Sequence, residues 1–77
     1  MSMGFELWDR LSGNRLGSFR TAQEAYRLVC KVVDADGAKS AEELVLGFQD
    51  DAGRTAVLSE GKELIEHARR AQLTAAS

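Results

Sequence analysis

The feature that most constrains the fold of this chain is a unit of two short strands, a glycine-containing turn and a helix, which occurs twice. In the first unit, residues 5–10 and 15–20 have strand composition and flank Leu-Ser-Gly-Asn, residue types that close β-hairpins. In the second unit, residues 44–49 and 54–58 flank Asp-Asp-Ala-Gly in the same way. We therefore expect an α+β fold of order ββαββα, in which two helices pack against a four-stranded, mostly antiparallel sheet.

A capping box predicts where the first helix begins. Thr21 precedes Glu24 by three residues, so the Thr21 hydroxyl can accept a hydrogen bond from the Glu24 N–H while the Glu24 carboxylate reaches back to the Thr21 N–H. Gly37 is a natural end, because glycine enters the left-handed region without steric cost. Between them, apolar residues recur at helical spacing: Ala25, Leu28, Val29, Val32 and Val33.

The second hairpin is followed by a second helical pattern, for which Ser59 is the expected N-cap. Its apolar positions are Leu64, Ile65, Ala68 and Ala71. Because 77 residues are enough for one domain and too few for two, we expect a single domain over residues 1–77. Within it we place one hairpin–helix unit at residues 5–37, another at 43–73, and a frayed tail at 74–77.

The turn of the second hairpin predicts its register. Asp-Ala-Gly fits a three-residue loop, a type I turn closed by a left-handed glycine. That loop sets Phe48 opposite Ala56 and Leu46 opposite Leu58. Because successive side chains of a strand alternate between faces, these residues make one apolar face of the sheet.

The two hairpins together predict a second apolar surface. An equivalent loop in the first hairpin sets Phe5 opposite Phe19 on the first face and Trp8 opposite Leu16 on the other. If both helices cover the first face, an apolar patch remains on the other, made of Trp8, Leu16, Val45 and Val57. Patches of this kind mark partner-binding surfaces. Two alternatives stay open: the second helix crosses over and covers the patch, or a shifted first register places Trp8 in the core.

Charge, cysteine content and the lack of long apolar segments predict where the protein is located in the cell. The net charge is −2, and it divides into +2 over residues 1–33 and −4 over residues 34–77. A single cysteine cannot form an internal disulfide, and the first residues lack the basic and apolar regions of a signal peptide. No apolar run approaches the roughly 20 residues that span a bilayer. We expect a cytoplasmic protein with no membrane contact.

Few residues in the chain suggest chemistry. His67 is the sole histidine and falls on the outer side of the second helix, where no nucleophile is marked. Cys30 follows Val29 within the first helix and is expected to pack as a small apolar side chain. The acidic residues between Asp34 and Glu43 miss the first ligand position of a calcium loop, which falls on a valine. We expect no enzyme activity, no metal and no cofactor.

Arginines on the first hairpin suggest a second class of partner. A two-stranded ribbon can enter a DNA major groove, and arginines contact phosphates. The candidate contacts are Arg10, Arg15 and Arg20, with Trp8 beside them. Glu6 and Asp9 interleave with these residues, so a solvated, charged edge is the alternative interpretation.

Residues 17–25, Gly-Ser-Phe-Arg-Thr-Ala-Gln-Glu-Ala, and residues 50–54, Asp-Asp-Ala-Gly-Arg, carry a family resemblance. Over residues 5–58 the chain resembles small prokaryotic domains of unknown function, which have a hairpin, a helix opened by T-x-x-E-A and a second hairpin with a D-x-G turn. The F-x-T-x-x-E-A junction is similar to that of integrase arm-type DNA-binding domains, and it falls here on Phe19, Thr21, Glu24 and Ala25. Those domains are usually strongly basic with three strands before the helix, whereas this chain is acidic with two.

The functional expectation is a non-enzymatic protein-interaction or regulatory module. We expect its partner to be a second copy in a homodimer, joined through a sheet face or edge, or another protein. The alternative is a nucleic-acid-binding module that uses the first hairpin.

Overall fold

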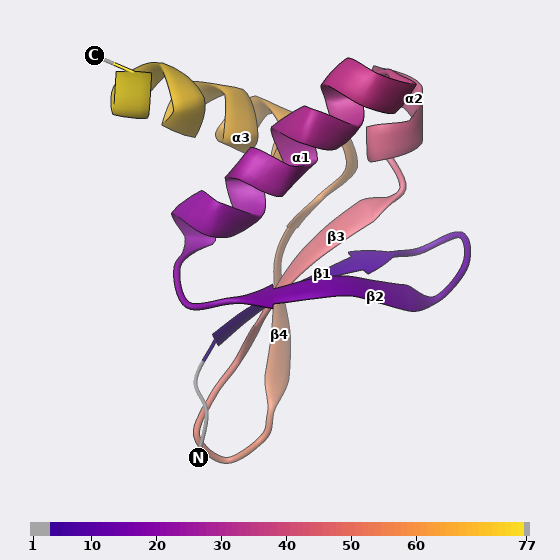
Figure 1. Ribbon diagram of the computed structural model, residues 1–77. Coiled ribbons are helices and arrows are strands. Elements are labelled where there is room, and N and C mark those ends of the chain that lie inside the picture. Colours follow the sequence, from indigo (N-terminus) through magenta and orange to yellow (C-terminus); the bar gives the residue numbers. More distant parts are fainter. Residues whose placement is uncertain (1–3, 77) are drawn as a thin grey trace.

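The computed structural model describes the backbone of residues 4–76 and the side chains of residues 4–73 (Figure 1). Four strands form one sheet, and three helices lie outside it. In chain order the elements are β1 (Gly4–Asp9), β2 (Asn14–Phe19), α1 (Ala22–Asp36), α2 (Ala38–Ala41), β3 (Leu44–Gln49), β4 (Thr55–Glu60) and α3 (Gly61–Ala76). This confirms the α+β fold of order ββαββα, with the single turn of α2 as an addition.

The sheet has the strand order β2-β1-β3-β4, and every neighbouring pair is antiparallel. The two hairpins therefore join through their first strands, and β2 and β4 are the edges. Helix α1 packs on β1 and β2, and α3 packs on β3 and β4. Figure 1 shows both long helices on the same side of the sheet. They run antiparallel, since Gln23 near the start of α1 donates a hydrogen bond from Nε2 to the Ala71 carbonyl oxygen near the end of α3, at 3.3 Å.

One hydrophobic core lies between the sheet and the helices. Leu7 of β1 and Leu46 of β3 are opposite each other and fully buried. The Phe5 and Phe48 rings, also opposite each other, meet edge to face with their centroids 5.2 Å apart. The remaining core residues are Ala25, Val29, Ala41, Leu44, Leu64, Ile65 and Ala68. The apolar stripes predicted from helical spacing thus provide the helix side of this core.

The predicted helix start and end are close to those observed. The Thr21 hydroxyl accepts a hydrogen bond from the Glu24 N–H at 3.3 Å, as expected for a capping box. The Glu24 carboxylate accepts from the Arg20 N–H instead of the Thr21 N–H. Helix α1 ends before Gly37, whose N–H donates to the Val33 carbonyl oxygen. Gly37 has φ 91° and ψ 160°, which is not the left-handed helical region but an extended region open essentially to glycine alone.

A longer first turn and two one-residue bulges change the predicted registers. Four residues, 10–13, separate the paired Asp9 and Asn14, so the first turn is one residue longer than the predicted three-residue loop and Trp8 lies opposite Arg15, not opposite Leu16. Leu16 in β2 has no cross-strand partner, and this extra residue restores the predicted register beyond it. Leu58 in β4 likewise has no partner, so Leu46 lies opposite Ser59 and not opposite Leu58. Both bulges fall on edge strands, where an extra residue breaks only one ladder and increases the local twist. The pair Phe5–Phe19, which lies beyond the first bulge as seen from the turn, is as predicted. The pair Phe48–Ala56, which lies between the second turn and its bulge, is also as predicted.

The bulge at Leu58 also changes the expected start of the second helix. Ser59 is buried within β4 and is not an N-cap, because the shifted register directs it toward the helices. Helix α3 instead begins at Gly61, which has a φ of 62°. The backbone of residues 74–76 continues α3, while residue 77 of the expected frayed tail lies outside the described residues.

Candidate functional site

The candidate site is the sheet face that points away from α1 and α3. Cross-strand pairing arranges its residues in two complete rows, each with one residue per strand. The central row is Ser18–Glu6–Gly47–Val57, and the upper row is Arg15–Trp8–Val45–Glu60. A lower row contains Gly4–Gln49–Thr55. We call these eleven residues the open face, because both long helices lie on the other side of the sheet (Figure 1).

Apolar side chains occupy the upper and central rows of the open face. Trp8 is 37% exposed and Val57 is 60% exposed, while Val45 is half-buried. Trp8 lies directly opposite Val45, and Val57 is the diagonal neighbour of Val45 across β3 and β4. Three of the four predicted interaction residues therefore share one surface. The fourth, Leu16, is the exposed bulge residue of the β2 edge.

Sequence reasoning did not identify Glu6 as a residue of this surface. Glu6 is only 7% exposed, although it lies on the face that no described helix covers. Its Oε2 atom is 3.3 Å from Nη1 of Arg15, which lies opposite Trp8 and is therefore the diagonal neighbour of Glu6 on β2. The direct cross-strand partners of Glu6 are Ser18 on β2 and Gly47 on β3, and Gly47 has no side chain. The alternation of β1 places Glu6 on the same face as Trp8, but only the pairing of β1 with β3 places it beside a glycine.

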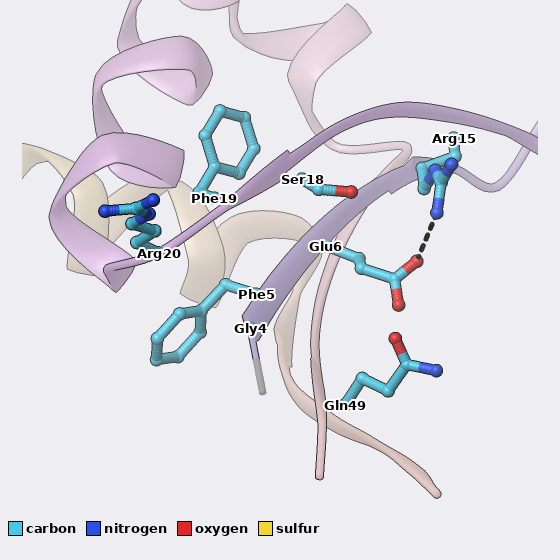
Figure 2. A pocket seen from close by; sticks show the side chains of 8 residues that line it. All are labelled: Gly4, Phe5, Glu6, Arg15, Ser18, Phe19, Arg20 and Gln49. Carbon is cyan, nitrogen blue, oxygen red and sulfur yellow. Dashed lines mark hydrogen bonds and ion pairs between the residues drawn. The ribbon is translucent and has the colours of Figure 1, made fainter. Parts of the chain in front are cut away.

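A shallow hollow of about 350 Å³ lies beside Glu6. Figure 2 shows the Glu6 carboxylate between the Arg15 guanidinium and the Gln49 amide. Its lining comes from the first half of β1, from β2 with the residue that follows it, and from the end of β3: Gly4, Phe5, Glu6, Arg15, Ser18, Phe19, Arg20 and Gln49. The hollow thus has a mixed charge, with one carboxylate and two guanidinium groups.

The three arginines proposed for nucleic-acid contacts have different surroundings. Arg10 forms ion pairs with Glu60 at 3.0 Å and Glu43 at 3.7 Å, so it ties the first turn to the end of β4 and to the segment before β3. The Arg15 charge is paired with Glu6. Arg20 is exposed, and its side chain makes no ion pair with residues 4–73. Two of the three positive charges are therefore balanced by carboxylates of the same chain.

The two other residues considered for chemistry lie on the helices. His67 is exposed on α3. Cys30 is half-buried on α1 and lines a groove of about 210 Å³ between α1 and α3, with Asp34 and Arg69 at its rim. Burial raises the pKa of the Cys30 thiol, the Asp34 charge raises it further, and the Arg69 charge opposes both. Within the described part of the chain, no group of three or more histidine, cysteine or acidic side chains could hold a metal ion.

None of the helices in residues 4–76 has the length and apolar character needed to cross a bilayer. Comparisons with family models, with curated proteins and with solved structures find no match. The resemblance of residues 17–25 and 50–54 to prokaryotic domains therefore stays a prediction.

Proposed function

We propose that this protein is a non-enzymatic, cytoplasmic interaction module that associates with a second copy of itself through the open face. The observation that carries the proposal is the apolar surface around Trp8, Val45 and Val57 on the side of the sheet that no described helix covers. The core on the other side already contains Leu7 and Leu46 fully buried. The apolar residues of the open face are therefore surplus to that core.

The composition of the open face supports protein binding. An interaction surface typically has an apolar centre rich in aromatic residues and arginine, surrounded by a polar rim. Here Trp8 and Val45 lie on the two central strands, while Arg15 and Glu60 lie at the two ends of the same row. Burial of an indole in particular removes a large apolar area from water.

Size-exclusion chromatography with light scattering tests this proposal. We expect about twice the chain mass at high concentration, and a return to the single-chain mass for Trp8→Ser, because the variant loses the largest apolar group of the surface. Leu73→Ser is the matched control, since Leu73 is 73% exposed on α3 and lies outside the open face. A wild-type protein that stays monomeric from about 1 to about 300 µM would contradict self-association.

Nucleic-acid binding through the first hairpin is the second proposal, and the geometry supports it less. Arg20 has no ion pair with residues 4–73 and lies at the other end of β2 from Arg15, while Arg10 and Arg15 are already ion-paired with carboxylates. This proposal requires salt-dependent binding to duplex DNA that is lost in Arg10→Glu combined with Arg15→Glu. Absence of binding at low salt eliminates it.

A further inference from the structure

The open face has a charge pattern that discriminates between the ways in which two copies could stack. Arg15 lies at the β2 end of the upper row and Glu60 at the β4 end of the same row. The central row contains one charged residue, Glu6 on β1. The three charged residues of the open face therefore lie on three different strands: Arg15 on β2, Glu6 on β1 and Glu60 on β4.

Two open faces can stack against each other through a twofold axis that lies in the plane between the two sheets. This axis can run parallel or perpendicular to the strands. An axis parallel to the strands places β2 of one copy over β4 of the other. Arg15 then faces Glu60 of the second copy, and Trp8 faces Val45 of the second copy, each contact occurring twice. Opposite charges at the rim and apolar groups at the centre coincide in this arrangement.

An axis perpendicular to the strands gives the opposite result. When it runs along the central row, at the centre of the face, it places each residue of that row over the same residue of the second copy, so Glu6 faces Glu6. Two carboxylates would then be brought together in an interface that excludes water, which is costly. Trp8 in the upper row would face the lower row, where its counterpart on the same strand is Gly4. This arrangement therefore also leaves the indole without an apolar partner.

We propose that the occupant of the open face is a second copy related by a twofold axis parallel to the strands, with Arg15 paired to Glu60 of the second copy. This inference rests on the proposed function. Arg15 and Glu60 have side chains 54% and 49% exposed, and each uses one terminal atom in its ion pair within the chain. A chain of alternating charges results: Glu6, Arg15, Glu60 of the second copy and Arg10 of the second copy.

The size of the face sets the expected strength of the contact. Four strands about 4.8 Å apart and six residues about 3.3 Å apart give a surface of roughly 20 by 20 Å on each copy. The total buried area is then on the order of 1,000 Å², at the lower limit for specific association. Sheets stacked face to face typically cross at about 30° because of their twist, so the facing rows meet most closely near their centres. The dimer is therefore expected to dissociate in the micromolar range.

Ser18 and Val57 provide a test of the axis direction. Both are exposed, both belong to the central row, and β2 and β4 are three strand spacings apart, so the two residues do not meet within one chain. With the axis parallel to the strands, residue 18 faces residue 57 of the second copy. With the perpendicular axis, residue 18 faces residue 18 and residue 57 faces residue 57.

The experiment measures the dimer dissociation constant by analytical ultracentrifugation for S18K, V57E and the double variant. We expect each single variant to dissociate about tenfold more readily, and the double variant to return to within about threefold of wild type, because two Lys–Glu pairs form between the copies. L73E is the control for the added carboxylate. Circular dichroism and urea midpoints verify that each variant is folded.

The outcomes test the direction of the twofold axis and the proposed self-association separately. A double variant that is weaker than either single variant overturns the parallel axis, since like charges then face each other. Additive weakening also overturns it. In both cases a dimer that is lost in Trp8→Ser still supports the proposed function. A wild-type protein that is monomeric throughout overturns both.

Discussion

Glu6 and Arg15 form an ion pair in which the carboxylate is almost fully buried and the guanidinium is half exposed. The pair joins β1 to the β2 edge on the open face, with Glu6 Oε2 3.3 Å from Arg15 Nη1. Arg15 is the one residue for which an ion pair with Glu6 is found among residues 4–73. Removal of Arg15 should therefore lower the free energy of unfolding, because the buried Glu6 carboxylate would lose this countercharge.

Arg15→Ala is expected to lower the free energy of unfolding by about 1–3 kcal/mol, because it leaves a buried carboxylate without its countercharge. Glu6→Gln added to Arg15→Ala should restore part of that loss, since the amide carries no charge. Arg54→Ala is the control: it removes the exposed Arg54–Asp50 pair and should cost less than about 0.5 kcal/mol. Urea unfolding followed by circular dichroism measures all three. Equal losses of stability for Arg15→Ala and Arg54→Ala would show that the Glu6–Arg15 pair contributes no more than an exposed ion pair.

The sequence predicts the element order, because that order depends on local chemistry. The capping hydroxyl of Thr21 and the glycine at position 37 each act within a few residues of their own position. The apolar stripe of α1, including Ala25 and Val29, is likewise a local repeat, and both residues are buried in the core. These features could be predicted because no distant residue is needed to explain them.

The bulges and the buried carboxylate could not be predicted in this way. A strand with a bulge at Leu16 or Leu58 shows the same alternation of apolar and polar residues as a regular strand on either side of the extra residue. Neither position has a residue type that marks a bulge. The buried Glu6 lies opposite Gly47, which is distant in sequence and adjacent only because β1 pairs with β3. The strand order, and with it the three rows of the open face, is a tertiary property.

Gly37→Ala is expected to lower the free energy of unfolding by about 1–3 kcal/mol. The cost arises from the backbone, since Gly37 has φ 91° and ψ 160° and an added Cβ would meet no atom within 4 Å. Asparagine tolerates the left-handed helical region but not this one, so Gly37→Asn should be as destabilising as Gly37→Ala. Recovery of stability by asparagine, measured by thermal unfolding, would show that the backbone has moved.

Ser59→Ala is expected to raise the free energy of unfolding by roughly 1 kcal/mol. The Ser59 hydroxyl oxygen is buried and has no hydrogen-bond partner among the described residues. An unpaired buried hydroxyl loses its water contacts without compensation, and alanine removes that penalty while filling nearly the same space. Ser59→Val tests the space itself, because added methyl groups should reduce the gain. Destabilisation by Ser59→Ala in urea would contradict the absence of a partner.

Cys30 is expected to react with iodoacetamide at pH 8 more slowly in the folded protein than in urea, because its raised pKa leaves a smaller share of the thiol as thiolate. Asp34→Asn should speed the reaction by lowering the pKa, and Arg69→Gln should slow it. Because the unfolded state loses this proton first, the contribution of Cys30 to stability is present below about pH 8.5 and falls as the pH rises above it. Equal rates in both charge variants would contradict these electrostatic effects.

Trp8 emission is expected to shift to shorter wavelength as the protein concentration rises through the micromolar range. Trp8 is the sole tryptophan of the chain and is 37% exposed, so the spectrum reports on the open face alone. Contact with Val45 of a second copy would remove water from the indole and reduce its quenching by acrylamide. Val57→Glu should show the same shift only at about tenfold higher concentration, whereas Leu73→Ser should follow the wild type. A mass that doubles while the emission stays constant would place the contact on an edge or on the helices and not on the open face.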